Sequence, residues 1–124
     1  MVSYHTPFSG FSVADIPEAK AFYADVVGLT VEDQPGGMLH LALGDGHFVL
    51  IYPKGPAHVP ASFTVLNLPV DEVAAAVEEL TARGVVFLRY DGMPQGEDGV
   101  MRGNGPDIAW FTDPSGNVVS IIEA

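Results

Sequence analysis

The segment that decides the fold reads FSGFSVADIPEAKAFYADVVGL and spans residues 8–29. Its first part, Phe8–Val13, is biased toward apolar residues and predicts a strand. Asp15 follows as a candidate helix cap, with Glu18 at the spacing of a capping box. Apolar residues then recur at helical spacing as far as Gly28, where a left-handed residue would end a helix. The segment therefore predicts a strand followed at once by an amphipathic helix of about three turns.

Three short strands are predicted after this helix. They are Leu29–Asp33, Met38–Leu43 and His47–Tyr52, and glycine-rich turns separate them. The stretch 53–60 contains three prolines and a glycine, so it can continue neither a strand nor a helix. We interpret it as a connector at the midpoint of the chain.

The same order of elements returns after the connector. The predicted strands of the second half are Ser62–Leu68, Val85–Tyr90, Ile108–Thr112 and Asn117–Ile122. Between the first two of these strands, Pro69 and Asp71 are expected to open a helix that Gly84 ends. A long polar and glycine-rich loop, 91–105, precedes the last two strands. Both halves therefore read as strand, helix, then three strands.

Offsets between matching positions support an internal repeat. Val13 corresponds to Val70 at an offset of 57, and Gly28 corresponds to Gly84 at an offset of 56. The turn glycines Gly46 and Gly116 are 70 apart, which is explained if the long loop is an insertion in the second copy. A chance match between two strand–helix units is the alternative.

The predicted fold class is α+β, with two βαβββ modules in tandem. Module 1 covers about 5–53, the connector is 53–60, and module 2 covers about 61–124. A unit of roughly sixty residues is marginal on its own, so we expect both modules to form one domain over residues 1–124 or to pair across a dimer. Sheets of this kind curve and leave a concave face opposite the helices, and such a face can form a pocket.

Two sets of residues resemble the vicinal oxygen chelate superfamily, which contains glyoxalase I, bleomycin and fosfomycin resistance proteins and extradiol dioxygenases. Phe11–Ile16, Ala21–Tyr23 and Val27–Leu29 are similar to its opening strand and helix. Trp110–Asn117 is similar to its closing aromatic segment and Asp-Pro-x-Gly-Asn turn. The resemblance covers nearly the whole chain and implies curved mixed sheets that enclose a pocket.

The resemblance also implies where metal ligands would lie. Metal-dependent members carry a His or Gln in each first strand and a Glu in each last strand. The corresponding positions here are Phe8, Val65, Leu50 and Ser120, and at most a single hydroxyl among them could bind a metal ion. The chain is therefore expected to have no metal or other cofactor, and to be closer to the bleomycin-binding members than to the enzymes.

Four histidines are present, and one of them differs from the rest by its position. His5, His47 and His58 lie near the N-terminus, after a turn and in the connector, where a surface location is the simpler explanation. His40 lies in mid-strand between two leucines, so its side chain points to the opposite face from theirs. It is a candidate ligand-binding group or general base, and a structural histidine is the alternative.

Aromatic side chains could line the predicted pocket. Trp110, the only tryptophan, is expected to form an aromatic wall with Phe8, Phe48 and Tyr52, although ordinary core packing would use the same residues. In the loop 91–105, Arg102 could pair with a carboxylate or phosphate of a ligand, or be a solvated loop charge.

Composition excludes several classes of function. Sixteen Asp and Glu against five Lys and Arg give a formal net charge of -11, which argues against nucleic acid as a partner. The chain has no cysteine, no phosphate-binding glycine loop and no recognisable Ser-His-Asp arrangement. No signal or membrane segment is evident, so a cytoplasmic protein is expected. The 48% hydrophobic content favours a globular homodimer.

Three functions follow as hypotheses. The first is a metal-independent protein that binds a small molecule in an apolar pocket. The second is a metal-dependent lyase or isomerase resembling glyoxalase I, with non-standard ligands that include His40 and a carboxylate. The third is a structural or regulatory domain without a ligand. Because only the second hypothesis is an enzyme, the sequence leaves open whether the chain is one. The candidate ligand-binding residues are Phe8, His40, Leu50, Tyr52, Val65, Arg102, Trp110 and Ser120.

Overall fold

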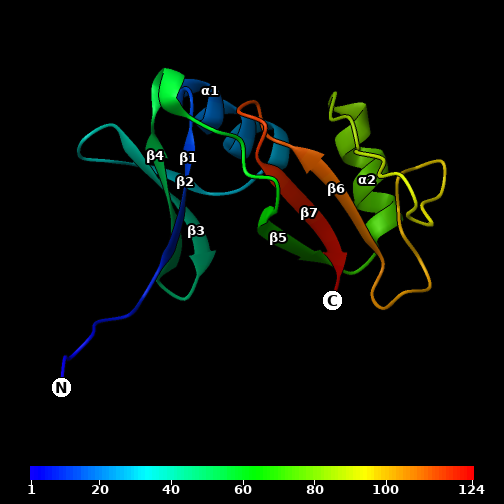
Figure 1. Ribbon diagram of the computed structural model, residues 1–124, viewed down its shortest axis with the longest axis horizontal. Helices are drawn as coiled ribbons and strands as arrows, with labels where there is room; N and C mark the ends of the chain where they lie inside the picture. Colours follow the sequence, from blue (N-terminus) through cyan, green and yellow to red (C-terminus); the bar gives the residue numbers. More distant parts are fainter. The chain divides into compact units, whose positions relative to one another are not determined.

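The computed structural model describes all 124 residues and divides the chain into two compact units, Met1–Val59 and Pro60–Ala124 (Figure 1). Each unit contains a mixed β-sheet with a helix against one face, so the chain has the predicted α+β fold. The boundary between the units falls inside the stretch 53–60 that was interpreted as a connector. No helix of the chain is long and apolar enough to cross a bilayer.

The first unit follows the predicted order of strand, helix and three strands. Its four-stranded sheet has the order β1-β4-β3-β2, in which β1 is parallel to β4 and the other neighbours are antiparallel. Its elements are β1 (Ser9–Val13), α1 (Ile16–Ala21), the π-helix η1 (Phe22–Val27), β2 (Val31–Gln34), β3 (Met38–Gly44), β4 (His47–Pro53) and the 3-10 helix η2 (Gly55–Ala57).

The helix of the first unit begins and ends as its residues predict. Asp15 has an extended backbone, and its carboxylate accepts a hydrogen bond of 2.9 Å from the backbone N–H of Glu18. At the other end Gly28 has a φ of 88°, in the left-handed region that glycine adopts without strain. The second half of the helix, η1, is wound as a π-helix, which the spacing of its apolar residues did not indicate.

The core of the first unit lies on the face of its sheet that α1 and η1 cover. α1 contacts both β3 and β4, and the ring of Tyr23 lies 6.0 Å from that of Phe11. The buried strand residues alternate along each strand, as expected of a sheet with one covered face. They are Phe11, Val13, Leu39, Leu41, Val49 and Ile51.

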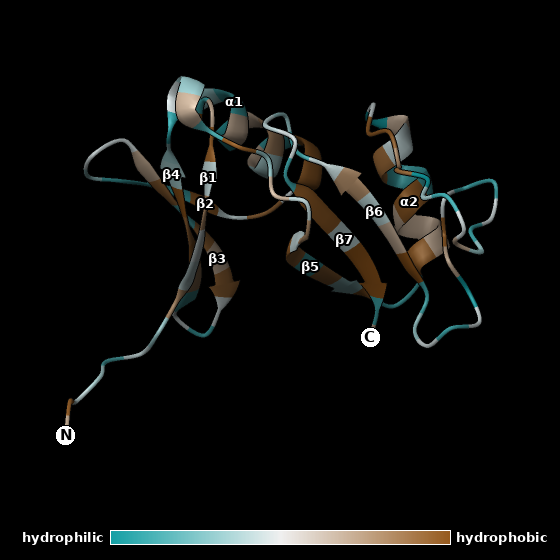
Figure 2. Ribbon diagram, in the orientation of Figure 1, coloured by the Kyte–Doolittle hydropathy of each residue, from teal (hydrophilic) through white to brown (hydrophobic).

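The second unit contains a three-stranded sheet with the order β5-β7-β6, where β5 is parallel and β6 antiparallel to β7. Its elements are β5 (Thr64–Val70), α2 (Val73–Ala82), β6 (Ile108–Thr112) and β7 (Val118–Glu123). α2 packs against β6 and β7, and Figure 2 shows that β7 is apolar along most of its length. Phe111 and Val119, paired across β6 and β7, are fully buried.

Two details of the second unit differ from the sequence-based expectation. The predicted strand Val85–Tyr90 is wrong, because this segment forms only one isolated bridge, between Phe87 and Phe111. The helix does not open at Pro69, which lies inside β5, but at Val73. Proline lacks a backbone N–H and is tolerated in β5 because this strand is at the edge of its sheet.

Candidate functional site

The uncovered face of the first sheet carries most of the candidate residues in this unit. Side chains of β1, β3 and β4 that alternate with the buried ones point to this face. We call it the open face and define it by Phe8, which immediately precedes β1, together with Gly10, Ser12, His40, Phe48, Leu50 and Tyr52.

An aromatic cluster occupies one part of the open face. The rings of His40 and Phe48 stack with centroids 3.7 Å apart and an interplanar angle of 12°. The ring of Phe8 lies 4.8 Å from that of Phe48, and Phe8 is 58% exposed. His40 and Phe48 are half-buried. A partly exposed set of rings can accept a flat ligand against its free surface, because aromatic groups provide a large contact area at low entropic cost.

Two other candidates, Leu50 and Tyr52, lie next to a glycine of β1. Gly10 is paired with Leu50 across β1 and β4. A Cβ atom added at Gly10 would lie 3.1 Å from the carbonyl oxygen of Leu50 and 3.7 Å from a ring carbon of Tyr52. The ring of Tyr52 would be in ordinary van der Waals contact with such a Cβ, and the tight contact would be with the carbonyl oxygen of Leu50.

A polar pair completes the open face. Ser12 Oγ and His58 Nδ1 are 2.8 Å apart in a part-buried hydrogen bond that joins β1 to the connector. The sequence placed His58 at the surface without a role, and nothing in its neighbourhood along the chain indicated that it would contact a residue 46 positions away. For Ser12 a signal was present, because the alternation of side chains along β1 puts Ser12 on the same face as Phe8.

Two further candidates of the second sheet, Trp110 and Ser120, alternate with the buried residues Phe111 and Val119. The rings of Trp110 and Tyr90 meet edge to face at 5.4 Å. Trp110 is paired across the strands with Ser120, which is fully buried and donates a 2.6 Å hydrogen bond to Oδ1 of Asn67. Tyr90 and Asn67 were not identified from the sequence.

The donor atoms at these positions do not suit a divalent metal ion. Leu50 and Ser120, the predicted last-strand positions, have Gly10 and Asn67 as their neighbours on the parallel strand. These four residues supply one hydroxyl and one amide, which is weaker than the His and carboxylate set that binds such ions. Nowhere in the chain do three or more His, Asp or Glu side chains gather around one point.

Val65 and Phe8, the positions counted for the first-strand ligands, lie elsewhere. Thr64 is paired with Val118 and Leu66 with Val119, so Val65 is the extra residue of a β-bulge. Phe8 stands two residues before Gly10, outside β1. The two positions counted from the sequence therefore lie two residues before the residues that pair with Leu50 and Ser120 in the structure, which are Gly10 and Asn67.

Arg102 has its partners within its own loop. Its guanidinium donates to Asp98 Oδ2 at 2.8 Å in an exposed ion pair. The hydrogen bond from Arg102 holds the pKa of Asp98 below its ordinary value, and the carboxylate raises the pKa of Arg102 in turn. The side chain is therefore paired within the loop, at an exposed position.

Comparison with known proteins identifies the family of the chain. The chain matches the family model of the glyoxalase/bleomycin resistance protein/dioxygenase superfamily over residues 7–121. It therefore belongs to this superfamily. A search of curated proteins finds no match.

Several solved structures share the fold. TnmS3, an antibiotic-binding protein from Streptomyces sp. CB03234, is 30% identical over 99% of this chain and 98% of that one, with a TM-score of 0.69. A glyoxalase/bleomycin resistance protein from the same organism is 31% identical over 94% and 99%, with a TM-score of 0.62. Lactoylglutathione lyase from Agrobacterium tumefaciens, at 20% identity over 98% and 95% with a TM-score of 0.67, shows the same fold only.

Proposed function

We propose that this protein binds a small, flat organic molecule on the open face, without a metal ion. The observation that carries the proposal is the half-buried stack of His40 and Phe48 with the exposed ring of Phe8 beside it, which presents aromatic surface on a sheet face rather than in the core. Trp110, Ser120 and the bulge residue Val65 belong to the second unit and stay separate candidate ligand contacts of that unit's own sheet. Arg102 remains a proposed contact only if a ligand displaces it from Asp98.

Polar groups beside the stack would orient the ligand. His40 itself, the Ser12–His58 pair and the hydroxyl of Tyr52 can exchange hydrogen bonds with a ligand that contains carbonyl, hydroxyl or amine groups. The net charge of -11 favours a neutral or cationic ligand over an anionic one, because the field of the protein raises the local concentration of cations.

Support also comes from the relatives. TnmS3 is described as an antibiotic-binding protein, and at 30% identity over nearly the full length of both chains it makes an antibiotic-like natural product the first class to test. Sequestration of such a compound needs binding alone. The unsuitable donor set at the family's metal positions is consistent with that role.

Bleomycin and a panel of planar polycyclic antibiotics would test the proposal by calorimetric titration. In these titrations, His40→Ala and Phe48→Ala should each weaken binding at least tenfold. Glu79→Gln, on the exposed surface of α2, is the control and should bind normally.

Two results would contradict the proposal. Unchanged affinity in both aromatic variants would remove the open face as the site. Stoichiometric zinc, nickel, manganese or iron in the purified protein, with a matching rise in Tm on metal addition, would favour the metal-dependent lyase or isomerase instead. Sedimentation would test the accompanying proposal that the protein is a homodimer, and a cytoplasmic location remains part of the proposal.

A further inference from the structure

A cavity of about 560 Å³ lies in the second unit, and none of the residues discussed above as ligand contacts lines it. One wall is a stripe of α2 whose members are three, four and seven residues from Ala74, and therefore share one side of the helix. The opposite wall is the segment after Gly84, and part of the long loop closes the end. The lining residues are Ala74, Val77, Glu78, Thr81, Val85, Val86, Phe87, Arg89, Glu97, Asp98 and Gly99.

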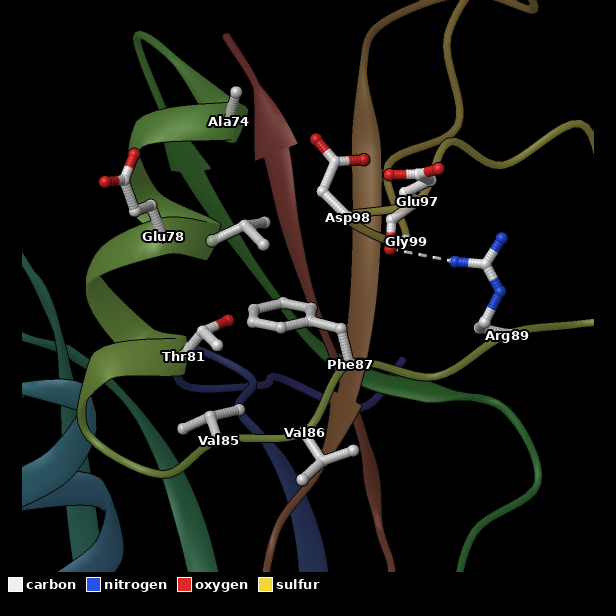
Figure 3. A pocket seen from close by; sticks show the side chains of 11 residues that line it. Ala74, Glu78, Thr81, Val85, Val86, Phe87, Arg89, Glu97, Asp98 and Gly99 are labelled. Atoms are coloured by element: carbon white, nitrogen blue, oxygen red, sulfur yellow. Dashed lines mark hydrogen bonds between the residues drawn. The ribbon is translucent and has the colours of Figure 1, made fainter.

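The floor of the cavity is apolar. Val77 and Val85 are buried, and Figure 3 shows the ring of Phe87 pointing across the cavity toward α2 near Thr81. Gly99 keeps the loop against this floor, because a Cβ at that position would lie 3.3 Å from the Cβ of Phe87. The volume falls within the range of about 300–1,000 Å³ that is typical of small-molecule sites.

The rim carries an excess of negative charge. Glu78 and Glu97 form no ion pair, whereas Asp98 is paired with Arg102. Arg89 is the one basic lining residue, and its guanidinium donates to the carbonyl oxygens of Gln95, Gly96 and Glu97, as the dashed line in Figure 3 shows in part. Arg89 is thereby committed to holding the loop, and two carboxylates are left to meet a cation.

We infer that this cavity is a second binding site, distinct from the open face, for an amphipathic organic cation: a primary amine with an aromatic or branched apolar body. The apolar body would lie against Val77, Val85 and Phe87. The ammonium group would lie at the rim, attracted by Glu78 on α2 and by Glu97 on the loop, which Figure 3 shows on opposite sides of the cavity. An anionic ligand is disfavoured, because three of the four charged residues that line the cavity, Glu78, Glu97 and Asp98, are acidic.

Three probes of similar size and different charge test the inference: 2-phenylethylamine, 2-phenylethanol and 3-phenylpropionate. Each is titrated at pH 7 into the full-length ¹⁵N-labelled protein and followed by amide chemical shifts. The amine should bind most tightly, and its shifts should be confined to residues 74–81, 85–89 and 97–99. Glu78→Gln and Glu97→Gln should each weaken amine binding about two- to fivefold and leave alcohol binding unchanged.

Two further variants separate charge at the site from general effects. Glu18→Gln removes one carboxylate from the exposed first turn of α1, in the other unit, and should bind the amine as the wild type does. Thr81→Leu extends an apolar side chain from α2 into the cavity and should weaken all three probes, while its amide spectrum reports that the protein is folded. The inference is overturned if the three probes bind alike, if none binds, if the shifts appear on the open face, or if Thr81→Leu binds undiminished.

Discussion

His40 and Phe48 stack face to face although they are not direct neighbours across β3 and β4. The register pairs His40 with Leu50, and Phe48 with Ala42, so the stacked rings are diagonal neighbours. Diagonal positions lie about 7–8 Å apart at the backbone and meet only through long or aromatic side chains. The stack therefore depends on the size of the two side chains and not on direct pairing of their backbones. It fixes the orientation of the imidazole on the open face.

A double-mutant cycle measures this relationship. His40→Ala and Phe48→Ala should each lower the free energy of unfolding, and the two effects should be non-additive by about 0.5–1.5 kcal/mol, the usual coupling of a stacked aromatic pair. Urea unfolding of the wild type, both single variants and the double variant gives the coupling. Strictly additive effects would mean that the stack does not stabilise the fold. As a comparison, His47→Ala should have little effect, because His47 is exposed at the start of β4.

Protonation of Asp98 is expected to depend on Arg102. The hydrogen bond from Arg102 lowers the pKa of Asp98, so the stabilisation from this pair is present above the ordinary value of 3.8 and is lost as the pH falls through the lower pKa of the folded state. Arg102→Gln should raise the pKa of Asp98, as measured by a ¹³C titration of its carboxyl group. Arg83→Gln, which removes the partner of Glu79 instead, is the matched control. An unchanged Asp98 titration in Arg102→Gln would show that the pair does not persist in solution.

A buried turn in the second unit should be sensitive to a small change. The carboxylate of Asp113 is nearly fully buried and accepts hydrogen bonds from the backbone N–H groups of Ser115 and Asn117 and from the side-chain amide of Asn117. Asn117 Oδ1 in turn accepts from the N–H of Ala61, which ties the turn to the residue that follows the connector. Asp113→Asn replaces an oxygen acceptor by a donor and should cost about 1–3 kcal/mol.

The matched control for this substitution lies in the other unit. Asp45→Asn makes the same chemical change in the β3–β4 turn, where Asp45 is exposed and has a φ of 52°, which asparagine also adopts readily. Its effect on urea unfolding should be within about 0.5 kcal/mol. Equal losses in the two variants would show that the buried hydrogen bonds of Asp113 contribute nothing specific.

The local parts of the fold were predictable because short-range chemistry determines them. The cap formed by Asp15 and the left-handed conformation of Gly28 depend on residues close in the chain, and both occur as expected. The segment Val85–Tyr90 has the composition of a strand, but pairing needs a partner over its whole length. It forms a single bridge to β6, and its neighbours in space include α2 and the loop, which the sequence pattern does not specify.

The sequence was sufficient to predict on which face of the sheet a candidate residue lies, but not which residues it contacts. Alternation around Leu39 and Leu41 placed His40 on the face opposite the core, where it lies. The Ser12–His58 hydrogen bond and the Val65 bulge were not predictable, because both depend on how distant segments come together. The cavity beside α2 was missed for the same reason, since the segments that line it are separated along the chain.

Cooperativity of unfolding tests whether residues 1–124 form one domain. Each compact unit has about sixty residues, a size that buries only about 60% of the surface of the unfolded chain and is marginal in isolation. We therefore predict that neither unit is stable alone, and that the full chain unfolds in urea in one transition seen alike by Trp110 fluorescence, which reports the second unit, and by NMR signals of the first unit. Fragments 1–59 and 60–124 should show no sharp transition. A fragment that unfolds cooperatively on its own, or two separated transitions in the full chain, would show that the units are independent domains.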